Sequence, residues 1–121
     1  MKADRRFHSC LYDEKTNAIF VFGGQSGNNK IATTEQWKLD TSQWESTTSL
    51  PEVSWSSAAV ASNSMDYIGF VAGGNTDSGT ISKVYGLRRS DLVWQVMPQQ
   101  LQTARTVHSM VNLPLDRIPG C

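Results

Sequence analysis

A repeat with a period of about fifty residues constrains this chain more than any other feature of its sequence. An apolar run ending in Gly23-Gly24 recurs as a similar run ending in Gly73-Gly74, and Trp44 recurs as Trp94. Two independent landmarks therefore share one offset. A period of this length is typical of repeat architectures, in which each copy is one supersecondary unit that buries its apolar face against its neighbour.

A third landmark spans two periods. Arg5-x-x-His8-Ser9 reappears as Arg105-x-x-His108-Ser109, and the intermediate copy has Ser54-Trp55-Ser56-Ser57 in its place. Between the landmarks the copies differ, because Trp37 lies closer to Trp44 than Tyr85 lies to Trp94. We expect the intervening turn to absorb this two-residue shift, since loops tolerate changes of length.

Each copy is predicted to form four short β-strands. Apolar, aromatic and β-branched runs alternate with turn-forming residues, and no segment shows a convincing helical period. In the first copy the strands are expected at 7–12, 19–22, 34–39 and around Trp44; in the second they are expected at 55–61, 67–72, 83–87 and 93–97. The pattern predicts an all-β fold.

This arrangement resembles the kelch repeat over residues 5–114. The resemblance is carried by the glycine pairs, by an aromatic residue followed by tryptophan, and by the Arg-x-x-His-Ser segments: Gly23, Gly24, Trp37 and Trp44 in the first copy, and Gly73, Gly74, Tyr85 and Trp94 in the second. The second copy departs from it, because Glu52-Val53-Ser54-Trp55 lacks the usual arginine. The resemblance implies four-stranded antiparallel blades of a β-propeller.

The blades expected from this resemblance divide the chain into three parts. Residues 1–50 form the first blade, 51–100 the second, and 101–121 contain the first strand of a third, at 107–113. A closed propeller has about four to eight blades, so the ring is incomplete. We expect either a piece of a longer protein or a chain that self-associates into a composite ring.

Several residues of the repeat are assigned structural roles. The glycine pairs let the chain leave the second strand with positive φ angles, and Trp44 and Trp94 fill the wedge between blades. His8 and His108 occupy equivalent positions, which favours a repeated structural hydrogen bond over a metal site needing several convergent ligands. The charged pairs Asp13-Glu14 and Arg88-Arg89 are expected in solvated turns.

The strand order predicts a partner-binding end. In up-and-down blades, the connections before the first strand and after the second share one end. The candidate binding residues there are Arg5, Arg6, Gln25, Asn28, Asn29, Lys30, Trp55, Asn75, Asp77 and Arg105. Arg5, Arg6 and Arg105 are expected to contact carboxylates of a partner; in the alternative, the repeated arginine braces neighbouring blades.

Composition narrows the classes of function. Eleven basic and eleven acidic residues cancel, which argues against a nucleic-acid or membrane partner. No signal peptide or apolar span is apparent, and two cysteines are too few for a disulfide scaffold, so a cytoplasmic location is the default expectation. We expect a non-enzymatic protein-interaction module without a cofactor, such as a substrate adaptor, scaffold or cytoskeletal binder that recognises another protein or peptide. The alternatives are part of a catalytic propeller resembling galactose oxidase, and purely structural blades of a larger ring.

Overall fold

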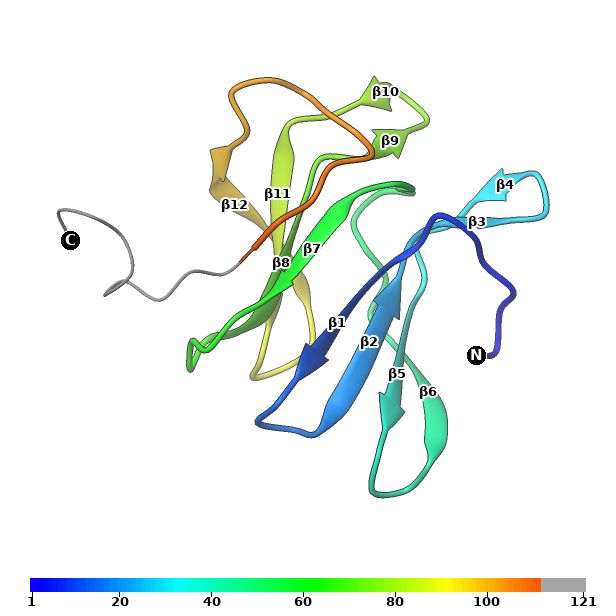
Figure 1. The fold of residues 1–121 in the computed structure, drawn as a ribbon, viewed down its shortest axis with the longest axis vertical. Coiled ribbons are helices and arrows are strands. Elements are labelled where there is room, and N and C mark those ends of the chain that lie inside the picture. Colours follow the sequence, from blue (N-terminus) through cyan, green and yellow to red (C-terminus); the bar gives the residue numbers. More distant parts are fainter. Residues whose placement is uncertain (112–121) are drawn as a thin grey trace, which may run out of the picture.

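Two four-stranded antiparallel sheets make up most of the structure (Figure 1). It is a computed structural model of the 121-residue chain, and it describes residues 1–111. Strands and loops account for all of these residues, and none of them is helical. Accordingly, residues 1–111 contain no helix with the length and hydropathy needed to span a membrane.

The first sheet has the strand order β1-β2-β5-β6. Its strands are β1 (Ser9–Asp13), β2 (Ala18–Phe22), β5 (Thr34–Lys38) and β6 (Gln43–Thr47). Between β2 and β5, the two-residue strands β3 (Gln25–Ser26) and β4 (Asn29–Lys30) pair as a small hairpin. We call this four-stranded sheet blade 1.

The second sheet repeats this plan with the strand order β7-β8-β11-β12. Its strands are β7 (Ala58–Ala61), β8 (Tyr67–Ala72), β11 (Lys83–Arg88) and β12 (Trp94–Gln100), with the hairpin β9 (Asn75–Thr76) and β10 (Gly79–Thr80) after β8. We call this sheet blade 2. The prediction of an all-β fold with four-stranded blades is confirmed, and residues 1–111 do not close a ring.

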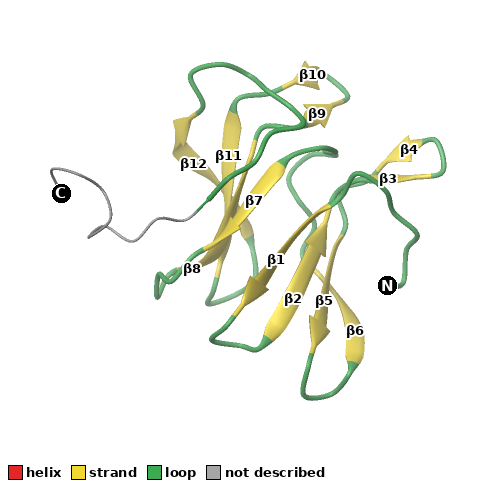
Figure 2. Ribbon diagram, viewed as in Figure 1, coloured by secondary structure: helices red, strands yellow, loops and turns green. Residues whose placement is uncertain are grey.

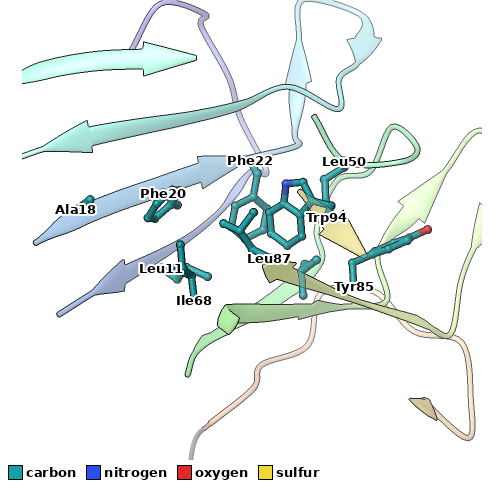
Figure 3. Packing of buried hydrophobic residues seen from close by; sticks show 10 residues of the cluster. Leu11, Ala18, Phe20, Phe22, Leu50, Ile68, Tyr85, Leu87 and Trp94 are labelled. Carbon is teal, nitrogen blue, oxygen red and sulfur yellow. The ribbon is translucent and has the colours of Figure 1, made fainter. Parts of the chain in front are cut away.

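The core lies between the two blades. Along β1, Ser9, Leu11 and Asp13 are buried, whereas Cys10 and Tyr12 face away and are exposed. Figure 3 shows the side chains that fill the space between the sheets, with the Trp94 ring beside Phe22 and Leu11 beside Ile68. The Phe22 and Trp94 ring centroids are 4.9 Å apart, with the planes inclined at 67°. This edge-to-face arrangement is one that aromatic pairs prefer.

The glycine pairs join the blades as well as ending β2 and β8. Gly23 and Gly24 have φ angles of +64° and +96°. The Gly24 N–H donates to the Ser54 carbonyl at 2.7 Å, and a Cβ on Gly23 would lie 2.5 Å from the same oxygen. Gly74 repeats this contact by donating to the Arg105 carbonyl at 2.9 Å. The segment leading into the next strand therefore lies directly against the glycines.

Strand pairing corrects the alignment of the two copies. Trp37 pairs with Trp44, and Leu87 pairs with Trp94. Tyr85 lies opposite Val71, the position that Glu35 takes opposite Val21. Tyr85 is therefore the counterpart of Glu35 and not of Trp37, and the turn absorbs no two-residue shift.

The strand predicted at 107–113 falls partly outside the described residues. Residues 107–111 have no strand conformation, and 112–113 are not described. In both blades the first strand is paired with the second. Among the described residues, 107–111 have no such pairing.

Candidate functional site

The connections predicted to share one end of the blades do so. Hairpins β3–β4 and β9–β10, the segments that lead into β1 and β7, and the segment after β12 lie at the top of Figure 2, and the remaining turns lie at the bottom. We call the top the hairpin end. The segments that lead into the first strand of each repeat, residues 5–8, 54–57 and 105–108, are called lead-in turns.

Each lead-in turn of the two blades is fixed to the hairpin of its own blade. Arg6 and Gln25 exchange backbone hydrogen bonds of 3.0 and 2.9 Å, and Trp55 and Asn75 exchange bonds of 3.1 and 2.9 Å. Four of the predicted binding residues are thereby brought together in two pairs. These bridges hold the side chains of the hairpin end on a defined backbone rather than on free loops.

An aromatic pair joins the lead-in turns of the two blades. The Phe7 and Trp55 ring centroids are 5.1 Å apart, and the Arg6 guanidinium carbon lies 5.6 Å from the Phe7 centroid. Arg6 also donates to the Gly27 carbonyl at 3.3 Å. Phe7 was not among the predicted binding residues because it was assigned to a strand, yet 51% of its surface is exposed.

A polar bridge crosses from one hairpin to the other. Lys30 of β4 donates to Asn75 Oδ1 at 2.9 Å and to the Thr76 carbonyl at 2.6 Å, and it lies 3.8 Å from the Asp77 carboxylate. The Trp55 indole N–H donates to the same Asn75 oxygen at 3.2 Å. Lys30 therefore helps to fix the orientation of Trp55, although the two residues come from different blades.

A hollow of about 450 Å³ opens at the blade 1 side of this end. Arginine, amide and glycine residues line most of it, together with one carboxylate: Asp4, Arg5, Arg6, Gln25, Gly27 and Asn28. Asn29 and Arg105 are exposed at the same end, and the Arg105 guanidinium contacts only the nearby Thr103 carbonyl, at 3.3 Å, among residues 1–111. The hollow is open to solvent and places these polar side chains around one depression.

Arg5 braces blade 1 from within. Its side chain has no exposed surface, and its guanidinium donates to Glu35 at 2.5 Å, to the Gly23 carbonyl at 3.1 Å and to the Thr33 carbonyl at 3.0 Å. Burial raises the pKa of Glu35, but hydrogen bonds from the Lys2 N–H and Arg5 outweigh it and hold that pKa below its ordinary value. The Arg5 charge is thus used inside blade 1, and none of these contacts reaches the neighbouring blade.

Blade 2 replaces this ion pair with another contact. It lacks the lead-in arginine, and Tyr85 stands in the position of Glu35, with its hydroxyl donating to Glu52. Burial is the main cause that raises the pKa of Tyr85 above its ordinary value, and the hydrogen bond to Glu52 adds to the effect. Blade 2 therefore differs from blade 1 at both members of the Arg5–Glu35 pair: the arginine is absent, and Tyr85 replaces the glutamate that it would have contacted.

The opposite end contains a contact that overturns two expectations. Asp13 is buried, and Arg89 makes a bidentate pair with it at 2.8 and 3.1 Å across the junction of the blades. Neither residue lies in a solvated turn as predicted, because blade packing encloses both. Burial raises the Asp13 pKa, but hydrogen bonds from Arg89 and Thr16 together hold it below the ordinary value.

The two histidines do not form the hydrogen bonds expected of them. His8 is exposed, and both ring nitrogens of His108 are buried without a partner among residues 1–111. The His108 ring instead packs beside Gly73, where a Cβ would lie 2.7 Å from its Cε1 atom. Within the same residues, no three His, Cys, Asp or Glu side chains are grouped to hold a metal ion.

These features define an all-β protein with two consecutive, equivalent four-stranded sheets joined at a glycine pair. Residues 15–51 match the kelch motif, a stretch that runs from the turn before β2 to just beyond β6. The chain therefore contains a kelch motif, and its two sheets are consistent with kelch blades. No curated protein matches the chain significantly.

Proposed function

We propose that this chain is a non-enzymatic interaction module that binds a protein or peptide through the hairpin end. The observation that carries the proposal is the convergence of Arg6, Phe7 and Trp55 beside a hollow of about 450 Å³. Arginine and tryptophan are enriched among residues that dominate binding energy at protein interfaces. Such a module would act as a substrate adaptor, scaffold or cytoskeletal binder.

The side chains offered to a partner differ in role. Arg6 is exposed and carries a guanidinium suited to bidentate contact with a carboxylate. Gln25 and Asn28 add amide donors and acceptors around the hollow. Arg5 supports this surface from inside the blade, so the partner-binding role assigned to the arginines rests on Arg6 and Arg105.

Peptide selection against the 121-residue chain tests the proposal. Peptides enriched from a random display library would be measured by calorimetry against wild type, Arg6→Ala and Arg88→Ala. Arg88 is a matched control because its side chain is 43% exposed at the opposite end and, among residues 1–111, it forms an ion pair with nearby Asp91 alone. We expect Arg6→Ala to weaken binding by about tenfold or more and Arg88→Ala to leave it unchanged.

Two results would contradict the proposal. Peptides that bind wild type and Arg6→Ala equally would place recognition elsewhere. Stoichiometric copper in the purified protein, measured by elemental analysis, would instead favour the catalytic propeller.

A further inference from the structure

The lead-in turns carry an unusual backbone conformation at one repeated position. Phe7, Ser56 and Val107 all have positive φ angles, of +55°, +55° and +52°. This left-handed region is costly for bulky and β-branched side chains, and glycine adopts it most easily. Phenylalanine and valine are therefore poor choices for the backbone that these turns require.

The backbone conformation itself has a clear use. The Ser56 N–H donates to the Phe7 carbonyl at 2.8 Å, and the Val107 N–H donates to the Ser56 carbonyl at 3.0 Å. Successive lead-in turns are thus connected by a chain of hydrogen bonds from one repeat to the next. These bonds use only main-chain atoms, so glycine would satisfy them as well.

The side chains at this position are not used by the core. Phe7 is 51% exposed and Val107 is 83% exposed. Trp55 lies against Phe7 and extends the apolar surface along the lead-in turn of blade 2. Phe7 and Val107 are therefore exposed at positions where they contribute little to the core and where the backbone conformation disfavours them. Backbone strain of this kind is concentrated at functional sites.

The charged residues of the hairpin end indicate which polar group of a partner would lie beside its apolar side chain. Arg5 is neutralised by Glu35, and Lys30 lies beside Asp77. Arg6 adjoins Phe7 in sequence and lies over its ring, and it makes no ion pair within residues 1–111. Arg105, two residues before Val107, is likewise unpaired there, whereas Asp4 is the one acidic residue lining the hollow.

We infer that the partner is a peptide segment with an apolar side chain that packs on Phe7 and Trp55 and a nearby carboxylate that pairs with Arg6. This inference rests on the proposed function and adds the chemistry of the ligand. The guanidinium above the Phe7 ring is held by its bond to the Gly27 carbonyl. An acidic group next to the apolar side chain would therefore meet a charge that is already positioned.

The test uses immobilised synthetic peptides with one Leu and one Glu at varied spacing on a Gly-Ser background, probed with the 121-residue chain. Matched peptides replace Leu by Ser or Glu by Gln. We expect binding to need both residues and to fall by about tenfold or more when either is replaced. Peptides that bind equally well with Ser in place of Leu would overturn the inference.

Variants of the chain separate the side chain from the backbone. Phe7→Gly is expected to abolish binding while its thermal unfolding temperature stays the same or rises, because glycine relieves the positive φ angle. Ser56→Gly makes the same backbone change without removing an apolar group and is expected to keep binding. Equal binding by these two variants would contradict the inference, and the peptide series decides the question if Phe7→Gly does not fold.

Failure of the inference is distinguishable from failure of the proposed function. If Arg6→Gln abolishes peptide binding but Phe7→Gly and the Leu-to-Ser peptides do not reduce it, the hairpin end binds partners without an apolar anchor. If no peptide binds wild type, or if Arg6→Gln binds as wild type does, the proposed function fails as well.

Discussion

Trp94 and Trp44 occupy the same position in the two blades, and their surroundings differ sharply. Trp94 is buried at the junction, where it packs on Phe22 and donates its indole N–H to Thr34 at 3.0 Å. Trp44 is only partly buried and contacts Trp37 of its own blade, at 5.3 Å between ring centroids. The face that carries Trp44 also carries Tyr12, which is 45% exposed. The comparison teaches that a repeat residue stabilises the fold only when the adjoining blade covers it.

The largest expected effect is that of replacing the buried tryptophan. Trp94→Ala should lower the free energy of unfolding by about 3–5 kcal/mol, because it removes a large buried side chain and leaves a cavity. Trp44→Ala should cost about 1 kcal/mol, since mainly the pairing with Trp37 is lost. Urea denaturation followed by circular dichroism measures the free energy of unfolding of both variants. Equal losses would show that the adjoining blade stabilises the two tryptophans equally.

Adjacent arginines give a second comparison of a covered site with an exposed one. Arg89→Met breaks the buried pair with Asp13 and is expected to cost about 3 kcal/mol, because it leaves a buried carboxylate without its cation. Arg88→Met removes an exposed pair with Asp91 and should leave stability almost unchanged, because solvent screens such a pair. The same denaturation experiment compares them; a harmless Arg89→Met would mean that the junction does not depend on this pair.

Two threonines that face each other across β5 and β6 provide a smaller contrast. Thr34→Val should cost about 1–2 kcal/mol, because the buried Trp94 indole N–H loses its acceptor. Thr47→Val should be neutral or stabilising, since the Thr47 hydroxyl is buried with no partner among residues 1–111. Thermal unfolding of the two variants checks the sign, and a stabilised Thr34→Val would remove the role given to this hydrogen bond.

The smallest effect is confined to acidic pH. Arg89 and Thr16 hold the Asp13 pKa below its ordinary value of 3.8 despite burial. Their stabilisation is complete above that value and is lost as pH falls through the lower pKa of the folded protein. In Arg89→Met, burial becomes the dominant effect and raises the Asp13 pKa. Protonation of Asp13 then removes the unpaired buried charge that destabilises the variant. Unfolding measured from neutral to acidic pH should show the gap between wild type and Arg89→Met closing; a constant gap would contradict the assignment.

The sequence predicted the blades better than it predicted their junction. Apolar runs such as Ala18–Phe22 and Tyr67–Ala72 alternate with turns, so their positions follow from local patterns. The β3–β4 and β9–β10 hairpins escaped prediction because strands of two polar residues carry no apolar pattern. The Asp13–Arg89 pair escaped because its members are far apart in sequence and each resembles an ordinary surface charge until the sheets pack.

The candidate site was predictable in position but only partly in role. Strand order alone placed Arg6, Gln25 and Trp55 at one end. The burial of Arg5 was not predictable from its own segment, because it depends on Glu35 facing inward from β5. Phe7 was missed because its positive φ angle removes it from the strand to which its apolar character assigned it.

The polar contacts at the junction make the two blades non-interchangeable. Arg89 and Leu39 are equivalent, since their N–H groups bond to the Asp66 and Asn17 carbonyls respectively. At the positions of Asp13 and Lys30, blade 2 has Ser62 and Thr80. A copy of this chain docked on blade 2 with the same geometry would bring Leu39 to Ser62 and would lack the lysine bridge. Both of these polar contacts between blade 1 and blade 2 would therefore be lost at such a junction.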